Sequence, residues 1–250
     1  MVTDGDSEQA KGLGIKRAQG EICGMFCADN EIMEKDLFQR VHNLIKTRAS
    51  AVYPSKYFYN KRDNSLNRYF ALIGGNDPIC YYIGKNDRES HVSSLNTFSI
   101  YQPSYGCNGF FYRSELIKAT DLVHYYPMDN AMEVPGEFIA INSQAIWHKT
   151  SDNLLTFLKK RYIYARDLFC DRSDRRWKML DTQQDYMRLC GFALCVITVL
   201  PCIITSFRGY RKVRDIAWFW HYPVCFGFLI TYTALAIRNL FKHGKLFQCR

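Results

Sequence analysis

The residues best suited to chemistry lie near the N-terminus, where an acidic residue follows a short apolar run. The run from Ile22 to Ala28 is typical of a strand buried on both faces, and Asp29 and Asn30 come directly after it. In open α/β sheets ligands collect at the carboxyl ends of strands, so an aspartate there can reach a bound cation or a phosphate-bearing substrate. The alternative is that Asp29 only caps the helix that follows.

Hydrophobic periodicity around this strand indicates an α/β domain over residues 1–150. Residues 8–19 form a predicted helix that is rich in small residues, and residues 31–48 carry the apolar stripe of a second helix. Further strands are predicted at 51–53, 110–113 and 138–141, and the domain ends at 145–148. The order of strand, helix and strand is that of α/β proteins.

The last hundred residues differ in charge and hydropathy from the rest. Residues 151–250 carry 17 Lys and Arg against 7 Asp and Glu, whereas residues 1–150 carry 16 against 17, so the net charge of +9 comes from the C-terminal part. Two apolar stretches, 189–207 and 216–237, lie there, and each is close to the roughly 20 residues that cross a bilayer. We therefore expect a membrane as partner and no nucleic acid, whose binding surface would not be interrupted by apolar spans.

These stretches predict a two-helix transmembrane hairpin over residues 187–240, followed by a basic tail at 241–250. Residues 151–186 precede the hairpin and contain an amphipathic helix, with Ser151 as its N-cap, that is typical of a segment lying on anionic headgroups. Basic residues flank both ends of the hairpin, so the positive-inside rule predicts an integral membrane protein with a cytoplasmic main domain. The alternative is that the two stretches are buried core helices of a soluble protein.

The ten cysteines contain no C-x-x-C pair. Cys23 and Cys27 lie in the predicted core strand, and four more lie in the apolar spans: Cys190, Cys195, Cys202 and Cys225. We interpret them as buried free thiols that behave as small hydrophobes rather than as metal ligands, which fits a reducing compartment.

The segment Ala10-Lys-Gly-Leu-Gly-Ile-Lys-Arg-Ala-Gln-Gly-Glu-Ile22, running into Cys27-Ala-Asp-Asn30, resembles the family 2 glycosyltransferases of the GT-A fold, and the similarity covers roughly residues 8–180. The resemblance implies a partial GT-A domain in an inverting glycosyltransferase of the hexosyltransferase type. It also implies a nucleotide-diphosphate sugar as donor, and the membrane hairpin suits a polyprenyl-phosphate or lipid-linked glycan as acceptor.

The resemblance further implies roles for particular residues. Asp29 matches the metal-binding element and would hold Mg²⁺ or Mn²⁺, and Asp129 would be the catalytic base. The donor diphosphate would meet a group of polar and basic residues: Lys11, Asp29, Asn30, Arg175 and Arg176. The acceptor-side loop would contain Gly106, Asn108 and Gly109. Trp177 and Lys178 would lie at the membrane interface. His148 is a further candidate for a phosphate contact, the alternative being a hydrogen-bonded structural histidine.

The chain departs from the family pattern in two respects that bear on activity. Cys27 occupies the first acidic position of the metal-binding element, so Asp29 is the remaining metal contact. The family's first strands, which hold the nucleotide base and ribose, have no counterpart before residue 8, and we expect an upstream segment or a partner protein to supply them. The alternative function is a catalytically degenerate glycosyltransferase-like membrane scaffold or assembly partner.

Overall fold

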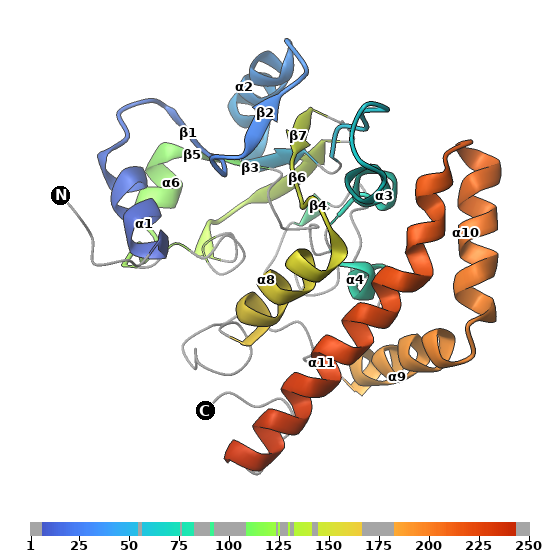
Figure 1. Cartoon of the computed structure of the whole chain (residues 1–250). Helices are drawn as coiled ribbons and strands as arrows, with labels where there is room; N and C mark the ends of the chain where they lie inside the picture. Colours follow the sequence, from blue (N-terminus) through green and yellow to red (C-terminus); the bar gives the residue numbers. More distant parts are fainter. Residues whose placement is uncertain are drawn as a thin grey trace. The chain divides into compact units, whose positions relative to one another are not determined.

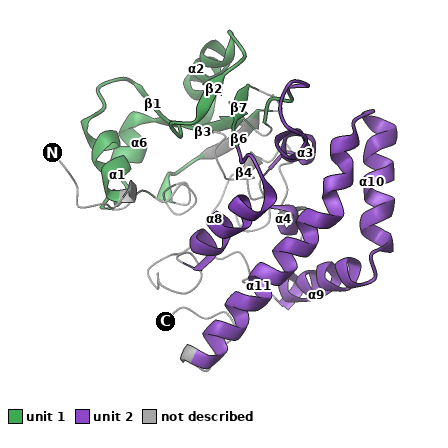
Figure 2. Cartoon of the chain, in the orientation of Figure 1, with its two compact units in different colours: residues 1–59, 85–149 green, residues 60–84, 150–250 purple. Residues whose placement is uncertain are grey.

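The computed structural model describes residues 7–54, 57–75, 77–82, 91–92, 109–123, 125, 130, 133–141, 145–166 and 183–243. These residues form a mixed α/β structure with two compact units (Figure 2). The first unit contains residues 1–59 and 85–149, and the second contains residues 60–84 and 150–250. A segment from the first half of the chain, 60–84, therefore belongs with the C-terminal helices.

A five-stranded mixed sheet forms the centre of the first unit, in the order β1-β5-β3-β6-β4 (Figure 1). Its strands are β1 (Ile22–Met25), β3 (Ala49–Pro54), β4 (His91–Val92), β5 (Phe110–Arg113) and β6 (Glu137–Ile141). Strand β5 is antiparallel to β1 and to β3, β3 is parallel to β6, and β4 is antiparallel to β6. Strands β1, β3 and β6 therefore run in the same direction, and their carboxyl ends lie at the same edge of the sheet.

Helix α2 (Leu37–Thr47) covers this sheet with one apolar face. Leu37, Val41 and Ile45 recur at a spacing of four residues and are buried with Val52 and Phe111 of the sheet. The sequence predicts this helix from residue 31, but residues 30–32 form strand β2 (Asn30–Ile32) instead. Strand β2 pairs with β7 (Ile146–His148) in a separate two-stranded antiparallel sheet. An apolar stripe marks the buried face of a helix, but it does not show where the backbone instead pairs with a strand that is distant in the sequence.

Two further helices lie at the N-terminal side of the first unit, α1 (Ser7–Arg17) and α6 (Ser114–Lys118), and they are in contact with each other. Helix α1 also lies close to the segment after α6, and this approach needs a small residue, because a Cβ at Gly12 would lie 2.3 Å from the carbonyl oxygen of Leu122. The small residues of the predicted helix at 8–19 therefore serve packing at this position.

The second unit is helical among the residues described. It contains α3 (Ser65–Ile73), α4 (Pro78–Tyr82), α8 (Leu154–Arg166), α9 (Gln183–Ile197), α10 (Leu200–Lys212), the 3₁₀ helix η2 (Ile216–Trp220) and α11 (His221–His243). Helix α8 is capped by Asn153, whose side-chain oxygen accepts the Thr156 N–H, and not by Ser151 as predicted. Helix α8 packs along α11 through Phe157, whose ring lies 5.8 Å from that of Phe228.

Buried polar pairs join the early segment 60–84 to the C-terminal helices of this unit. The Arg68 guanidinium donates to both carboxylate oxygens of Asp215, at 2.8 and 3.1 Å. Asp77 accepts hydrogen bonds from Tyr232 at 2.9 Å and from Arg161. Removing one member of such a pair leaves a buried group without its partner, which is strongly destabilising.

One helical stretch of the described chain, Ile216–Phe241, is long and apolar enough to cross a membrane by length and composition. Half of its most apolar window is buried inside the structure. The other predicted span, 189–207, is not one straight helix, because α9 and α10 meet at an angle of 86°. Pro201 is tolerated in the first turn of α10 but could not lie in the interior of one continuous helix, and Val199 at the break has a positive φ of 65°. Taken together, the pair is long and apolar enough for a broken span or a re-entrant loop by length and composition alone.

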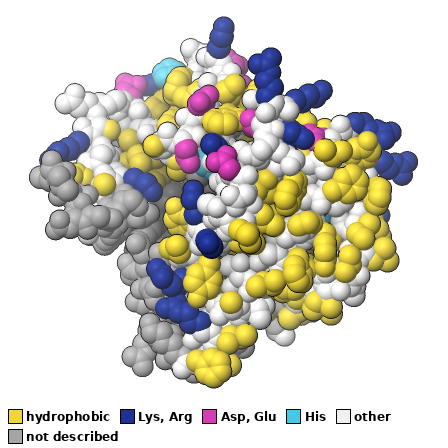
Figure 3. All heavy atoms as spheres, in the orientation of Figure 1, with side chains coloured by type: hydrophobic (Ala, Val, Ile, Leu, Met, Phe, Trp, Pro, Cys, Tyr) yellow, Lys and Arg dark blue, Asp and Glu magenta, His cyan; other side chains and the backbone are white. Residues whose placement is uncertain are grey.

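A large apolar surface is exposed on the second unit. Figure 3 shows hydrophobic side chains spread over the face where α9, α10 and α11 lie. The large exposed side chains of these elements and of η2 are Tyr186, Met187, Leu194, Ile197, Leu200, Ile203, Ile204, Phe207, Ile216, Phe219, Phe226, Ile230, Ile237, Leu240 and Phe241. A contiguous apolar patch of this kind is rare on soluble monomers and marks a membrane or protein interaction site.

The contact of α10 with η2 gives a test of the helical unit. A Cβ at Gly209 would lie 2.2 Å from the indole ring of Trp218, so Gly209→Ala is expected to destabilise the chain by about 1 to 3 kcal/mol. The matched control is Gly191→Ala in α9, where nothing lies within 4 Å of the new Cβ and helix propensity improves by up to about 1 kcal/mol. Thermal unfolding in detergent measures both, and equal melting temperatures would contradict this packing.

Candidate functional site

Asp29 lies in a turn at the edge of the main sheet where the parallel strands end. The turn joins β1 to β2 and is closed by a hydrogen bond from the Asn30 N–H to the Cys27 carbonyl oxygen at 3.1 Å. The Asp29 side chain is 54 % exposed. A carboxylate in this position can bind a ligand directly, because nothing has to unfold to expose it.

A histidine that the sequence places far away lies beside this carboxylate. His148 is opposite Asn30 in the pairing of β2 with β7, and its Nδ1 lies 3.0 Å from Asn30 Oδ1 and 3.4 Å from Asp29 Oδ1. With Nδ1 protonated, the imidazole donates to the amide oxygen of Asn30 and faces the carboxylate of Asp29, both of which accept. The histidine is buried, and the ring of Tyr57 lies 5.4 Å away. His148 is therefore fixed in place and holds the turn that carries Asp29.

Gly109 brings a third segment to the same edge of the sheet. It directly precedes β5, and Phe110 of β5 is paired with Met25 at the end of β1. Gly109 has a φ of +78°, and a Cβ there would lie 2.6 Å from the ring of Phe26. The predicted acceptor-side loop therefore ends next to the segment that leads to Asp29.

The other predicted site residues divide into two groups. Lys11 is half-buried on α1. The neighbouring residue in that helix, Gly12, lies against the backbone of Leu122. Seven predicted residues lie outside the described part of the chain: Gly106, Asn108, Asp129, Arg175, Arg176, Trp177 and Lys178.

The cysteines of β1 and of the following turn lie close to this site in the chain. Cys23 is buried in the strand, and burial raises the pKa of its thiol. Cys27 is half-buried, and neither cysteine forms a disulfide bond with another described cysteine. A protonated thiol is a poor ligand for Mg²⁺ or Mn²⁺, which prefer oxygen. The carboxylate of Asp29 and the amide oxygen of Asn30 are the hard oxygen donors of this turn.

Sequence reasoning identified Asp29 and Asn30 but missed that His148 faces them. Strands β2 and β7 are three residues each, too short for an alternating pattern to be recognised.

The first unit also has a cavity of about 530 Å³ lined by Ile22 and Arg113. These residues are paired at the opposite end of β1, so the cavity is separate from the edge that carries Asp29.

Comparison of the chain with protein-family models found no match, and a search of curated proteins found no significant match.

The contact between Gly109 and Phe26 can be tested by substitution. Gly109→Ala adds a methyl group against the Phe26 ring and requires an alanine at positive φ, so we expect the free energy of unfolding to fall by about 1 kcal/mol or more. The control is Gly14→Ala on α1, where nothing lies within 4 Å. Chemical denaturation of the two variants in detergent measures the difference, and an unchanged stability of Gly109→Ala would show that this close approach does not form.

Proposed function

We propose that the chain is a membrane-anchored inverting glycosyltransferase of family 2, built on a partial GT-A fold. It would move a sugar from a nucleotide-diphosphate donor to a polyprenyl-phosphate or lipid-linked glycan acceptor. The observation that carries the proposal is the place of Asp29, which is exposed at the carboxyl edge of three parallel strands and backed by a buried histidine. This edge is where α/β proteins bind phosphate-bearing ligands.

The donor set at this edge fits Mg²⁺ or Mn²⁺. Asp29 offers a carboxylate and Asn30 an amide oxygen, the ligand types that such ions prefer. A divalent cation bound there would supply positive charge to the departing diphosphate. His148 contacts the side chains of both Asp29 and Asn30 through Nδ1, and it would hold their oxygens in place. Residues that hydrogen-bond to metal ligands in this way raise the affinity of a site for its metal.

The remaining assignments follow from the family resemblance. Asp129 would act as the base if the acceptor is a hydroxyl group. If the acceptor is a lipid phosphate, the nucleophile is already an anion and Asp129 would orient it. Lys11, Arg175 and Arg176 would contribute positive charge near the diphosphate.

The apolar surface of the second unit supports membrane anchoring. Helix α11 would cross the bilayer, and the broken pair α9 and α10 would form a second or re-entrant segment. The C-terminal part of α10 and the connection after it carry exposed basic side chains, namely Arg208, Arg211 and Lys212 in the helix and Arg214 in the connection. With the basic flanks on both sides of the hairpin, we place the main domain in the cytoplasm.

The second candidate function is a scaffold that keeps the glycosyltransferase fold without its activity. The observation that favours it is Cys27, because a thiol stands where the family has its first metal-binding acid. Under this proposal Asp29 would be one acid of an unused site, and substituting it would change no transfer of sugar.

The decisive substitution is Asp29→Asn, which keeps the size and removes the charge. We expect metal-dependent transfer from radiolabelled UDP- and GDP-sugars to polyprenyl phosphate to fall by at least about a hundredfold, because the departing diphosphate loses its counter-charge. The control is Glu31→Gln, since Glu31 is exposed on β2 and pairs with Trp147, on the face opposite to Asn30 and His148. Transfer that persists unchanged in Asp29→Asn would overturn the catalytic assignment.

Membrane anchoring predicts how the chain behaves on extraction. Membranes washed with alkaline carbonate should retain the full chain, and detergent should release it, because the exposed apolar side chains of α9, α10 and α11 need an apolar solvent. Release by carbonate alone would contradict anchoring and would favour a soluble protein whose apolar helices are covered by a partner.

A further inference from the structure

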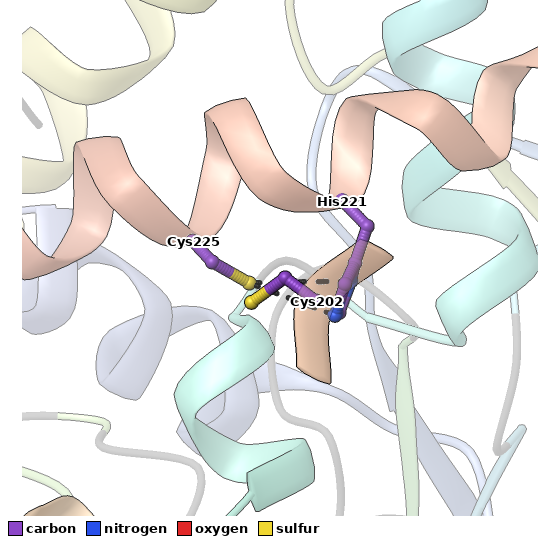
Figure 4. A group of neighbouring side chains, drawn as sticks. All are labelled: Cys202, His221 and Cys225. Carbon is purple, nitrogen blue, oxygen red and sulfur yellow. Dashed lines mark hydrogen bonds between the residues drawn. The ribbon is translucent and has the colours of Figure 1, made fainter. Parts of the chain in front are cut away.

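A cluster of soft ligand atoms lies inside the second unit, where α10 packs on α11. Cys202 comes from the first turn of α10, and His221 and Cys225 come from the first two turns of α11 (Figure 4). Residues four apart lie on one face of a helix, so His221 and Cys225 project together toward Cys202. All three side chains are at most 1 % exposed. One ligand atom from each lies within 4.8 Å of the other two.

The distances are close to those of a thiolate and imidazole metal centre. Cys225 Sγ lies 3.8 Å from His221 Nε2. In a tetrahedral zinc site, with Zn–S bonds of about 2.3 Å and Zn–N bonds of about 2.0 Å, the sulfur and nitrogen atoms are about 3.5 Å apart. The same sulfur lies 3.9 Å from Nδ1, so the imidazole has to turn until Nε2 faces a shared ion before these atoms form a coordination shell.

Two tyrosines complete the surroundings of the imidazole. The Tyr69 hydroxyl lies 2.9 Å from His221 Nδ1, and the Tyr82 hydroxyl lies 2.9 Å from Nε2 and 3.7 Å from Cys202 Sγ. A metal-bound histidine almost always donates its other ring N–H to a hydrogen-bond acceptor, and Tyr69 is placed to accept from Nδ1. Tyr82 adjoins two of the three ligand atoms, which is where a fourth ligand would lie.

We propose that Cys202, His221 and Cys225 bind one Zn²⁺, with the Tyr82 hydroxyl at the fourth position. Two thiolates balance the charge of the ion, so the loaded centre is neutral and can be buried. Its surroundings are apolar on one side, where the ring of Phe192 lies 5.1 Å from that of Tyr82. Sulfur and imidazole ligands favour Zn²⁺ over Mg²⁺ and Mn²⁺, which prefer oxygen. The ion would tie the start of α10 to the start of α11 and to α4.

This site is separate from the edge that carries Asp29 and would be structural rather than catalytic. From the sequence alone, Cys202 and Cys225 are interpreted as inert thiols, because no C-x-x-C pair marks them. The cluster becomes visible only when α4, α10 and α11 are brought together. Without a metal, the same side chains would form a hydrogen-bonded group of neutral thiols, hydroxyls and imidazole.

Metal analysis of the full chain purified in detergent tests the proposal. We expect about one zinc per chain in the wild type and less than about one tenth of that in the double variant Cys202→Ser/Cys225→Ser, because both thiolate ligands are lost. The matched control is Cys190→Ser, which removes an exposed thiol of α9 outside the cluster and should leave the zinc content unchanged. Equal zinc content in the wild type and the double variant would overturn the site.

Cobalt binding decides the matter if the double variant fails to fold. Wild-type chain treated with a chelator and then titrated with Co²⁺ should show sulfur-to-cobalt charge-transfer absorption, and Tyr69→Phe should weaken Zn²⁺ affinity about 10- to 100-fold by removing the partner of Nδ1. Absence of that absorption would show that the thiols are not ligands. Copper or iron in place of zinc would overturn the assignment of the metal.

Discussion

The antiparallel pairing of β1 with β5 is the interaction on which the candidate site depends. It sets the end of β1 beside the start of β5, so the turn carrying Asp29 and the loop ending at Gly109 leave the sheet at one edge. The pairing of β5 with β3, and of β3 with β6, then brings the other parallel strands to the same edge. Strand β7 follows β6 in the chain and returns His148 to Asn30. The β1–β5 register therefore places Asp29 near Gly109, and the separate β2–β7 register places Asn30 opposite His148.

The second unit depends on buried polar side chains more than on the pairing of strands. Its helices expose large apolar side chains, so the polar contacts that fix how the helices pair lie on their inward faces. These contacts are the Arg68–Asp215 pair and the hydrogen bonds from Arg161 and Tyr232 to Asp77. Hydrogen-bonded pairs of this kind suit helices in a bilayer, because hydrocarbon offers no hydrogen bonds, although both side-chain polar atoms of Asn239 in α11 are buried without a hydrogen-bond partner. The cluster around His221 is part of the same arrangement, and a bound metal would make it a fixed point.

Sequence predicted the local features well and the distant ones poorly. Strand Phe110–Arg113 has the predicted bounds, because a run of β-prone residues stops there at a serine. The helix expected at 31–48 begins only at Leu37, because residues 30–32 pair with β7 as a strand. Hydropathy found the apolar stretch 189–207 but not its 86° break, since hydropathy carries no direction. His148 lies more than a hundred residues from Asp29, and Tyr69 and Tyr82 lie more than a hundred residues from His221, so no local pattern identifies these contacts.

The central claim is that Asp29 holds a divalent cation for a nucleotide-diphosphate ligand. The most direct measurement is equilibrium binding of UDP and GDP to the detergent-purified full chain, with Mn²⁺ and with EDTA. The proposed function predicts binding of at least one of the two that requires Mn²⁺ and is lost in Asp29→Asn but kept in Glu31→Gln. Absence of binding, or binding that is equal in Mn²⁺ and EDTA, would contradict the claim and leave the scaffold as the better account.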